Sequence, residues 1–120
     1  MKPRGIDIDN WTTQLRKGLL ELCIMNLLGK QELYGYDLVK QLGRVPGLVV
    51  TEGTIYPLLS RLRKTGLLTT RIEESSSGPA RRYYALSEEG TRVRTLMNRC
   101  WGELTEGVGR IRQQGEETHG

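Results

Sequence analysis

The segment TEGTIYPLLSRLRK, residues 51–64, carries hydroxyl groups, a phenol and cations at a spacing that collects them on one side of a helix. Its apolar residues recur at helical intervals, at positions 55, 58, 59 and 62, so the polar side chains fall on the opposite face. Such groups at the start of a helix suit the DNA major groove and its flanking phosphates. We expect the contacts to come from Thr51, Glu52, Gly53, Thr54, Tyr56, Pro57, Ser60, Arg61 and Lys64.

Pro57 lies inside this predicted helix, where a proline normally removes a backbone hydrogen bond and kinks the chain. The carbonyl that it crowds belongs to Gly53, and the helix has barely begun there. We therefore expect a cost well below the ~3 kcal/mol of an interior proline. Because Gly53 and Pro57 both face outward, the first turns carry little bulk and the backbone could approach another surface closely. Alternatively, Pro57 only rigidifies an early turn on a solvated face, and the segment alone favours neither interpretation.

A second basic segment follows in residues 67–86. The strand-like runs LLTTRIEES and RRYYALS are separated by turn residues that include Gly78, which predicts a β-hairpin. Arg71, Arg81 and Arg82 lie on or beside the turn, where they could enter a minor groove or follow the phosphate backbone. A solvated basic hairpin is the alternative. Residues 51–86 contain six basic and three acidic side chains, so most of the net charge of +4 lies in this third of the chain.

Two helices are predicted before this segment, and one after it. Apolar periodicity predicts a first helix over residues 12–28 and a second that ends at Gly43, followed by a very short strand at residues 48–50. Ser87 is the expected N-cap of a long last helix. We expect that helix to fray beyond about Gly107, because glycines at 102, 107 and 109 each cost ~1 kcal/mol relative to alanine. Residues 113–120 are predicted to be a disordered tail.

This order of elements indicates a mainly α protein with a small β-hairpin, arranged as a winged helix-turn-helix over residues 1–86. A single C-terminal helix follows over residues 87–112. The first and last helices both have apolar stripes that are broad for one small core, which is a mild indication of a second buried surface. The chain of 120 residues has no internal repeat or linker that suggests a larger assembly of domains.

Catalysis, metal binding and cofactor binding have little support. His119 is the only histidine and lies in the predicted tail, and no serine or cysteine has a recognisable base partner. Phosphate-binding loops and metal-ligand clusters are absent from the sequence. Cys23 and Cys100 lack CxxC spacing and are expected to be reduced, buried thiols. The longest apolar run is too short to cross a membrane and the N-terminus does not resemble a signal peptide, so a cytoplasmic protein is expected.

Four motifs together resemble the PadR family of bacterial transcriptional regulators, in its short subfamily with a single C-terminal helix. They are LRKGLLELCIMNLL, YGYDLVKQL, TEGTIYPLLSRLRKTGLL and GPARRYYALSEEG, and the resemblance runs from about Leu15 to Leu104. It implies a winged helix-turn-helix homodimer that binds an inverted-repeat operator and usually represses, and that releases DNA when an effector binds. The recognition helix would be residues 51–65 and the wing residues 67–86, with Gly78, Arg81 and Arg82 contacting DNA.

The resemblance also implies that the first helix and the helix after Ser87 form the dimer interface, and a second copy of the chain would cover their excess apolar faces. Some multidrug-responsive members of the family stack flat aromatic ligands against a tryptophan at the position of Trp101. An apolar stripe such as Met97, Cys100 and Trp101 more commonly forms the core of a dimer interface. The residues expected at the dimer or effector interface are Leu15, Leu19, Cys23, Leu96, Met97, Cys100, Trp101 and Leu104.

A winged-helix module that binds another protein, without DNA, is the alternative function. The two functions predict different surfaces, because a protein-docking face should be more apolar than the small, hydroxylated and cationic face of residues 51–64.

Overall fold

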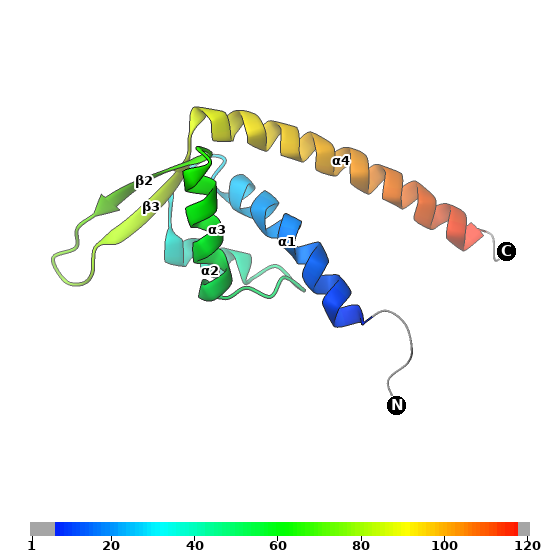
Figure 1. Ribbon diagram of the computed structural model, residues 1–120, viewed down its shortest axis with the longest axis horizontal. Helices are drawn as coiled ribbons and strands as arrows, with labels where there is room; N and C mark the ends of the chain where they lie inside the picture. The colour runs from blue at the N-terminus through cyan, green and yellow to red at the C-terminus, as the bar shows by residue number, and fades with distance from the viewer. Residues whose placement is uncertain (1–6, 118–120) are drawn as a thin grey trace.

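The computed structural model describes residues 7–117 and has the architecture of a winged helix (Figure 1). Its elements are α1 (Ile8–Leu27), β1 (Leu33–Tyr34), α2 (Gly35–Leu42), α3 (Glu52–Lys64), β2 (Leu68–Glu73), β3 (Arg81–Leu86) and α4 (Glu88–Glu117). The three strands form one antiparallel sheet in the order β1-β3-β2. The predicted class, mainly helical with a small hairpin, is confirmed. Figure 1 shows the β2–β3 wing projecting on one side of the molecule and the end of α4 projecting on the other.

The core lies where α1, α2, α3 and the sheet meet. Helix α3 contributes residues at the spacing that the sequence predicts, whereas the residues of α1 that are buried include Met25, which was not predicted. Each fully buried aliphatic side chain contributes about 1.5–3 kcal/mol relative to an exposed one. In α3, positions 55, 59 and 62 are buried while Leu58 is half-buried. The side chains with the least exposure are Ile24, Met25, Leu38, Leu42, Ile55 and Leu59.

The short strand is Leu33–Tyr34, and the prediction of a strand at residues 48–50 is wrong. Leu33 pairs with Tyr84 and Tyr34 with Tyr83, so β1 forms the edge of the sheet immediately before α2. In the segment predicted as a strand, Leu48 packs in the core and Val49 is exposed, but the backbone has no strand partner. A short apolar run is a property of one segment of the chain, whereas a β-strand also needs a second segment to form hydrogen bonds with it.

The start of α1 differs from the prediction, whereas the C-terminal end of α3 and the N-terminal cap of α4 agree with it. Helix α1 begins at Ile8, four residues earlier than expected, because the Asp7 carboxylate accepts hydrogen bonds from the backbone N–H groups of Asp9 (3.0 Å) and Asn10 (3.4 Å). The predicted stop of α3 is confirmed: Gly66 has φ of +86°, a conformation that favours glycine. Ser87 caps α4 as predicted, with Oγ accepting from the Gly90 N–H at 2.9 Å.

Helix α4 continues to Glu117, so the prediction of fraying beyond Gly107 is wrong, and so is the predicted tail as far as residue 117. Residues 118–120, with His119, lie outside the described part of the chain. Once the first turns have formed, each further residue that is fixed adds one backbone hydrogen bond, and the Glu106–Arg110 ion pair spans one turn of the distal half. Three dispersed glycines therefore do not interrupt the helix. No helix within residues 7–117 is long and apolar enough to span a bilayer.

A polar network fixes α4 against the C-terminal end of α1. The side-chain amides of Asn26 and Asn98 exchange two hydrogen bonds of 2.8 Å, and Arg94 Nε donates to Asn26 Oδ1 at 3.0 Å. The Arg94 guanidinium lies over Gly29, where a Cβ atom would come within 2.7 Å of it. From this crossing the two helices diverge toward the N-terminus of α1 (Figure 1).

Gly90→Ala is expected to lower the free energy of unfolding by about 1–3 kcal/mol or more, because a Cβ at this position would lie 2.1 Å from the Leu67 carbonyl oxygen. That oxygen also accepts from the Ser87 N–H at 3.0 Å, so the backbone has little room to move. Urea denaturation measures the change. Gly102→Ala is the control, since the space beside Gly102 is open, and equal stabilities of the two variants would contradict the described packing.

Candidate nucleic-acid interface

The outward face of α3 is exposed, as the helical periodicity predicts, except at Ser60. Thr51 has the extended backbone of an N-cap, but its hydroxyl lies 3.1 Å from that of Thr54 and caps no backbone N–H. Ser60 is half-buried. The remaining predicted contact residues of this helix are exposed, namely Glu52, Gly53, Thr54, Tyr56, Pro57, Arg61 and Lys64.

Gly53 is not required by the fold. A Cβ atom there would meet only Thr51 Oγ1, at an ordinary contact distance of 3.8 Å, and the positive-φ glycines of the described residues are Gly47 and Gly66. Alanine would favour the helix over glycine by about 0.5–1 kcal/mol. The missing side chain therefore lowers helix stability and leaves the first turn of α3 with almost no bulk beside Pro57.

Tyr56 connects α3 to the start of α2. Its ring packs so closely on Gly35 that a Cβ at Gly35 would lie 2.9 Å from Tyr56 Cε1, and the phenol remains 38% exposed. Burial raises the pKa of Tyr56, and the nearby Glu52 carboxylate raises it further. The phenol is therefore protonated at neutral pH and can both donate and accept a hydrogen bond. Gly35 was not among the predicted site residues, because only its contact with Tyr56 identifies it.

The two cations of α3 that were predicted as contacts are placed differently. Arg61 forms an ion pair with Glu21 of α1, although its side chain is 63% exposed. Lys64 is exposed and has no carboxylate partner among residues 7–117. Lys64 is thus available to a phosphate without rearrangement, whereas Arg61 must first leave Glu21.

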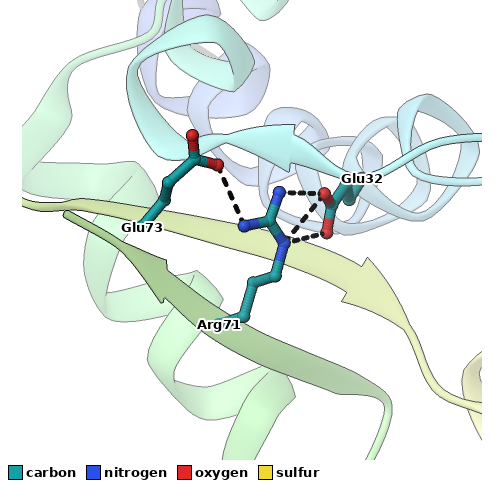
Figure 2. A network of polar contacts seen from close by, with 3 residues as sticks. All are labelled: Glu32, Arg71 and Glu73. Atoms are coloured by element: carbon teal, nitrogen blue, oxygen red, sulfur yellow. Dashed lines mark hydrogen bonds and ion pairs between the residues drawn. The ribbon is translucent and has the colours of Figure 1, made fainter. Parts of the chain in front are cut away.

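Arg71 holds the base of the wing and is not a free cation (Figure 2). Its Nε lies 2.9 Å from both carboxylate oxygens of Glu32, and its Nη1 lies 3.0 Å from Glu73 Oε2. The guanidinium also lies over the Tyr83 ring, 4.5 Å from its centroid. The hydrogen bond from Arg71 lowers the pKa of Glu32, and the Glu32 and Glu73 carboxylates raise that of Arg71. Arg71 therefore orients β2 relative to the segment before β1.

This network makes stability depend on pH in a defined direction. Because the folded-state pKa of Glu32 is lowered below the ordinary value of 4.5, its contribution is present above that value and is lost as the pH falls through the folded pKa. The difference in unfolding free energy between the wild type and Glu32→Gln should be constant near neutral pH and shrink toward zero in acid. Urea titrations at several pH values measure it. In an Arg71→Gln background the pH-dependent difference should disappear; its persistence there would contradict the pairing.

The other wing residues separate into two faces. Successive residues of a strand point to opposite sides. Arg81 shares a face with Tyr83 and lies over the Tyr34 ring, 5.2 Å from its centroid. Arg82 shares a face with the buried Tyr84, toward α3, and its Nη1 lies 3.3 Å from Thr70 Oγ1. Gly78 is exposed in the loop between the strands. Only Arg82 of the two arginines therefore lies on the side of the sheet that faces α3.

The apolar residues predicted for a dimer or effector interface gather between α1 and α4. Most of them line one open groove of about 300 Å³, which also includes Gly18 and Leu22; the predicted members are Leu15, Leu19, Met97, Cys100, Trp101 and Leu104. Cys23 and Leu96 do not line it. Cys23 packs against the core instead, and burial raises the pKa of its thiol. Both thiols are free, but the prediction of a buried Cys100 is wrong for the single chain, where it is exposed.

The apolar stripe of α4 continues beyond the groove into solvent. Trp101 and Leu104, at the edge of the groove, are 42% and 61% exposed, and Val108 and Ile111, beyond it, are 54% and 69% exposed. Among residues 7–117, no three side chains of the metal-ligating types lie close enough to hold an ion.

Comparison with known proteins agrees with this geometry. The model of the transcriptional regulator PadR-like family matches residues 24–96. Transcriptional regulator Rv3488 of Mycobacterium tuberculosis is 32% identical over 95 residues, which cover 79% of this chain and 87% of that protein. Transcriptional regulator YqjI of Escherichia coli is 32% identical over 75 residues, but the match spans only about a third (34%) of its length.

A solved structure shows the same fold. The X-ray structure of a PadR-like transcription factor from Bacteroides fragilis has 43% sequence identity and a TM-score of 0.72, and the match covers 85% of this chain and 98% of that one. The family match extends from the last turn of α1 through α3 and the wing to the first third of α4. The chain therefore belongs to the PadR-like family of transcriptional regulators.

Proposed function

We propose that the protein is a cytoplasmic homodimer that binds an inverted-repeat operator in duplex DNA and represses transcription. In this proposal α3 enters the major groove and the wing follows the adjacent phosphate backbone. The observation that carries the proposal is the outward face of α3, which lacks bulk at Gly53 and Pro57 and is bordered by hydroxyls and by the exposed Lys64. A protein-docking face, the alternative, would be more apolar.

The exposed apolar stripe of α4 and the open groove beside it support the homodimer. Large apolar patches on a monomer indicate an interface, and a two-fold symmetric dimer would cover the same stripe on both copies. Two copies would then present two α3 helices, which must match half-sites about one helical turn, or ~34 Å, apart.

Footprinting of the DNA that flanks the reading frame tests the operator. The expected result is protection of an inverted repeat whose half-sites are centred about 10 base pairs, or a multiple of that, apart. Protection that overlaps promoter elements, with lower transcription in vitro when protein is added, would support repression. A single asymmetric protected site, or increased transcription, would contradict the respective part of the proposal.

Phosphate-contacting and base-reading residues should respond differently to substitution. Lys64→Ala and Arg82→Ala should weaken binding to all duplexes alike and reduce the dependence of affinity on salt, by about 0.9 in the log–log slope for each phosphate that is no longer neutralised. Thr54→Ala and Tyr56→Ala should instead change the ratio of affinities for different operators. Fluorescence anisotropy with the footprinted operator and a scrambled duplex measures both quantities. Unchanged affinity and unchanged discrimination for Tyr56→Ala would refute its assigned role.

We further propose that a small, flat aromatic effector binds beside Trp101 and releases the protein from DNA. The groove between α1 and α4 is lined almost entirely by apolar side chains, and a ligand there would alter the angle between the helices and so the spacing of the two α3 helices. Quenching of tryptophan fluorescence tests this, in a Trp11→Phe background that leaves Trp101 as the only tryptophan. Aromatic compounds that quench the fluorescence of Trp101 and also lower the affinity for DNA would support the effector. Compounds that quench Trp101 but leave the affinity for DNA unchanged would contradict a regulatory role for this groove.

A further inference from the structure

A second groove, of about 420 Å³, lies between α1 and α3 on the side of α3 opposite to Tyr56. It is lined by Lys17, Leu20, Thr54, Pro57, Leu58 and Arg61. Thr54 and Pro57 belong both to this groove and to the outward face of α3, so the groove is continuous with the surface proposed to enter DNA. The lining combines two cations and a hydroxyl with an apolar floor.

Lys17 occupies an unusual place in the α1 pattern. It lies on the same side of the helix as Ile24 and Leu28, seven and eleven residues later, which are both buried in the core. The buried core does not reach Lys17, and its exposed side chain lines the groove together with Thr54 and Pro57 of α3. Lys17 has no carboxylate partner among residues 7–117.

Contacts on both sides hold the walls of this groove in place. Arg16 Nε donates to the Gly47 carbonyl at 2.9 Å, which ties α1 to the loop before α3. Arg61 pairs with Glu21, which lies one turn after Lys17 on α1. An ion pair this exposed contributes little stability, so a phosphate can replace the carboxylate at small cost.

We propose that this groove is a binding site, or seat, for the DNA phosphate backbone, in which Lys17 binds a phosphate and Arg61 stays paired with Glu21 until DNA binds. The inference rests on the proposed DNA binding and adds α1 to the interface. The charge of the seat matches a phosphodiester, and its apolar floor of Leu20, Leu58 and Pro57 suits the faces of deoxyribose rings.

Salt-dependent binding to a labelled duplex of mixed sequence tests the seat, because phosphate contacts do not depend on sequence. Lys17→Gln is expected to lower the log–log salt slope by about 0.9 for each bound protomer and to weaken affinity about five- to tenfold at 0.1 M salt. Glu21→Gln is expected to have the opposite sign, with a tighter complex and a steeper slope, because Arg61 becomes free. Lys30→Gln, which removes the same charge from the exposed turn after α1, is the matched control and should leave the slope unchanged.

Thermal denaturation of each variant checks that the fold is intact. A Lys17→Gln slope equal to that of Lys30→Gln, while Lys64→Ala still lowers it, would overturn the seat and leave the proposed function standing. Weaker binding by Glu21→Gln would overturn the competition for Arg61. Absence of duplex binding by the wild type even at low ionic strength would instead refute the proposed function itself.

Discussion

Gly53→Leu is expected to weaken operator binding at least about 100-fold while leaving the fold as stable as before, or slightly more stable. A Cβ atom at Gly53 meets only Thr51 Oγ1, at an ordinary contact distance, and leucine favours a helix over glycine by about 0.5–1 kcal/mol. The same side chain would stand between the first turn of α3 and the floor of the major groove. Fluorescence anisotropy with the footprinted operator and thermal denaturation of the same preparations measure the two effects.

The opposite signs of these effects make this test specific. Most substitutions that impair a function also destabilise the protein, whereas this one should separate stability from binding. Gly102→Leu is the matched control, because it makes the same change at another open helical glycine, far from α3. Full operator affinity in Gly53→Leu would show that the outward face of α3 does not approach DNA closely.

The double substitution Leu104→Glu/Val108→Glu is expected to abolish the dimer and to reduce affinity for a two-half-site operator by about 100-fold or more. Both side chains are exposed on α4, at 61% and 54%, and two carboxylates at a symmetric apolar interface would be buried without partners. A monomer lacks the second α3 helix and so loses the gain in affinity from binding two half-sites at once, which is typically 10²–10⁴-fold. Analytical ultracentrifugation and binding to operators with one or two half-sites measure these effects.

Two glutamates on the opposite face of the same helix provide the control. Thr95→Glu/Gln113→Glu adds the same charge to α4 without altering the apolar stripe, and should preserve both the dimer and the tight complex. If the Leu104→Glu/Val108→Glu protein remained dimeric, the partner surface would lie elsewhere on the chain. If it became monomeric but kept full affinity for the two-half-site operator, the two α3 helices would not act as a pair.

Much of the fold follows from signals within short stretches of sequence. The buried positions of α3, its stop at Gly66 and the cap at Ser87 depend on side-chain periodicity and local hydrogen bonds, and all three are as predicted. Helix α1 was predicted too short because the cap at Asp7 lies before the first apolar turn. The strand β1 was missed, because its partner β3 lies about 50 positions later and no local pattern reveals the pairing.

The residue types of the candidate interface were predictable from the sequence, but the ion pairs that its arginines form were not. The face of α3 could be identified from spacing alone, whereas the pairing of Arg61 with Glu21 joins residues 40 positions apart. The Glu32–Arg71 contact, across 39 positions, likewise turns a presumed DNA-facing arginine into the clamp of the wing. Lys17 was overlooked for the same reason, since its position near α3 depends on how α1 crosses the core.

The most direct test of the central claim, that α3 and the wing bind duplex DNA, is the affinity of the wild-type protein for its footprinted operator and for a scrambled duplex across a series of salt concentrations. The account predicts tighter binding to the operator and, for both duplexes, a linear fall of log affinity with log salt, with a slope near −0.9 for each phosphate neutralised. Lys64→Ala should lower that slope. Affinity that does not change with salt, or no binding to either duplex at low ionic strength, would contradict the account.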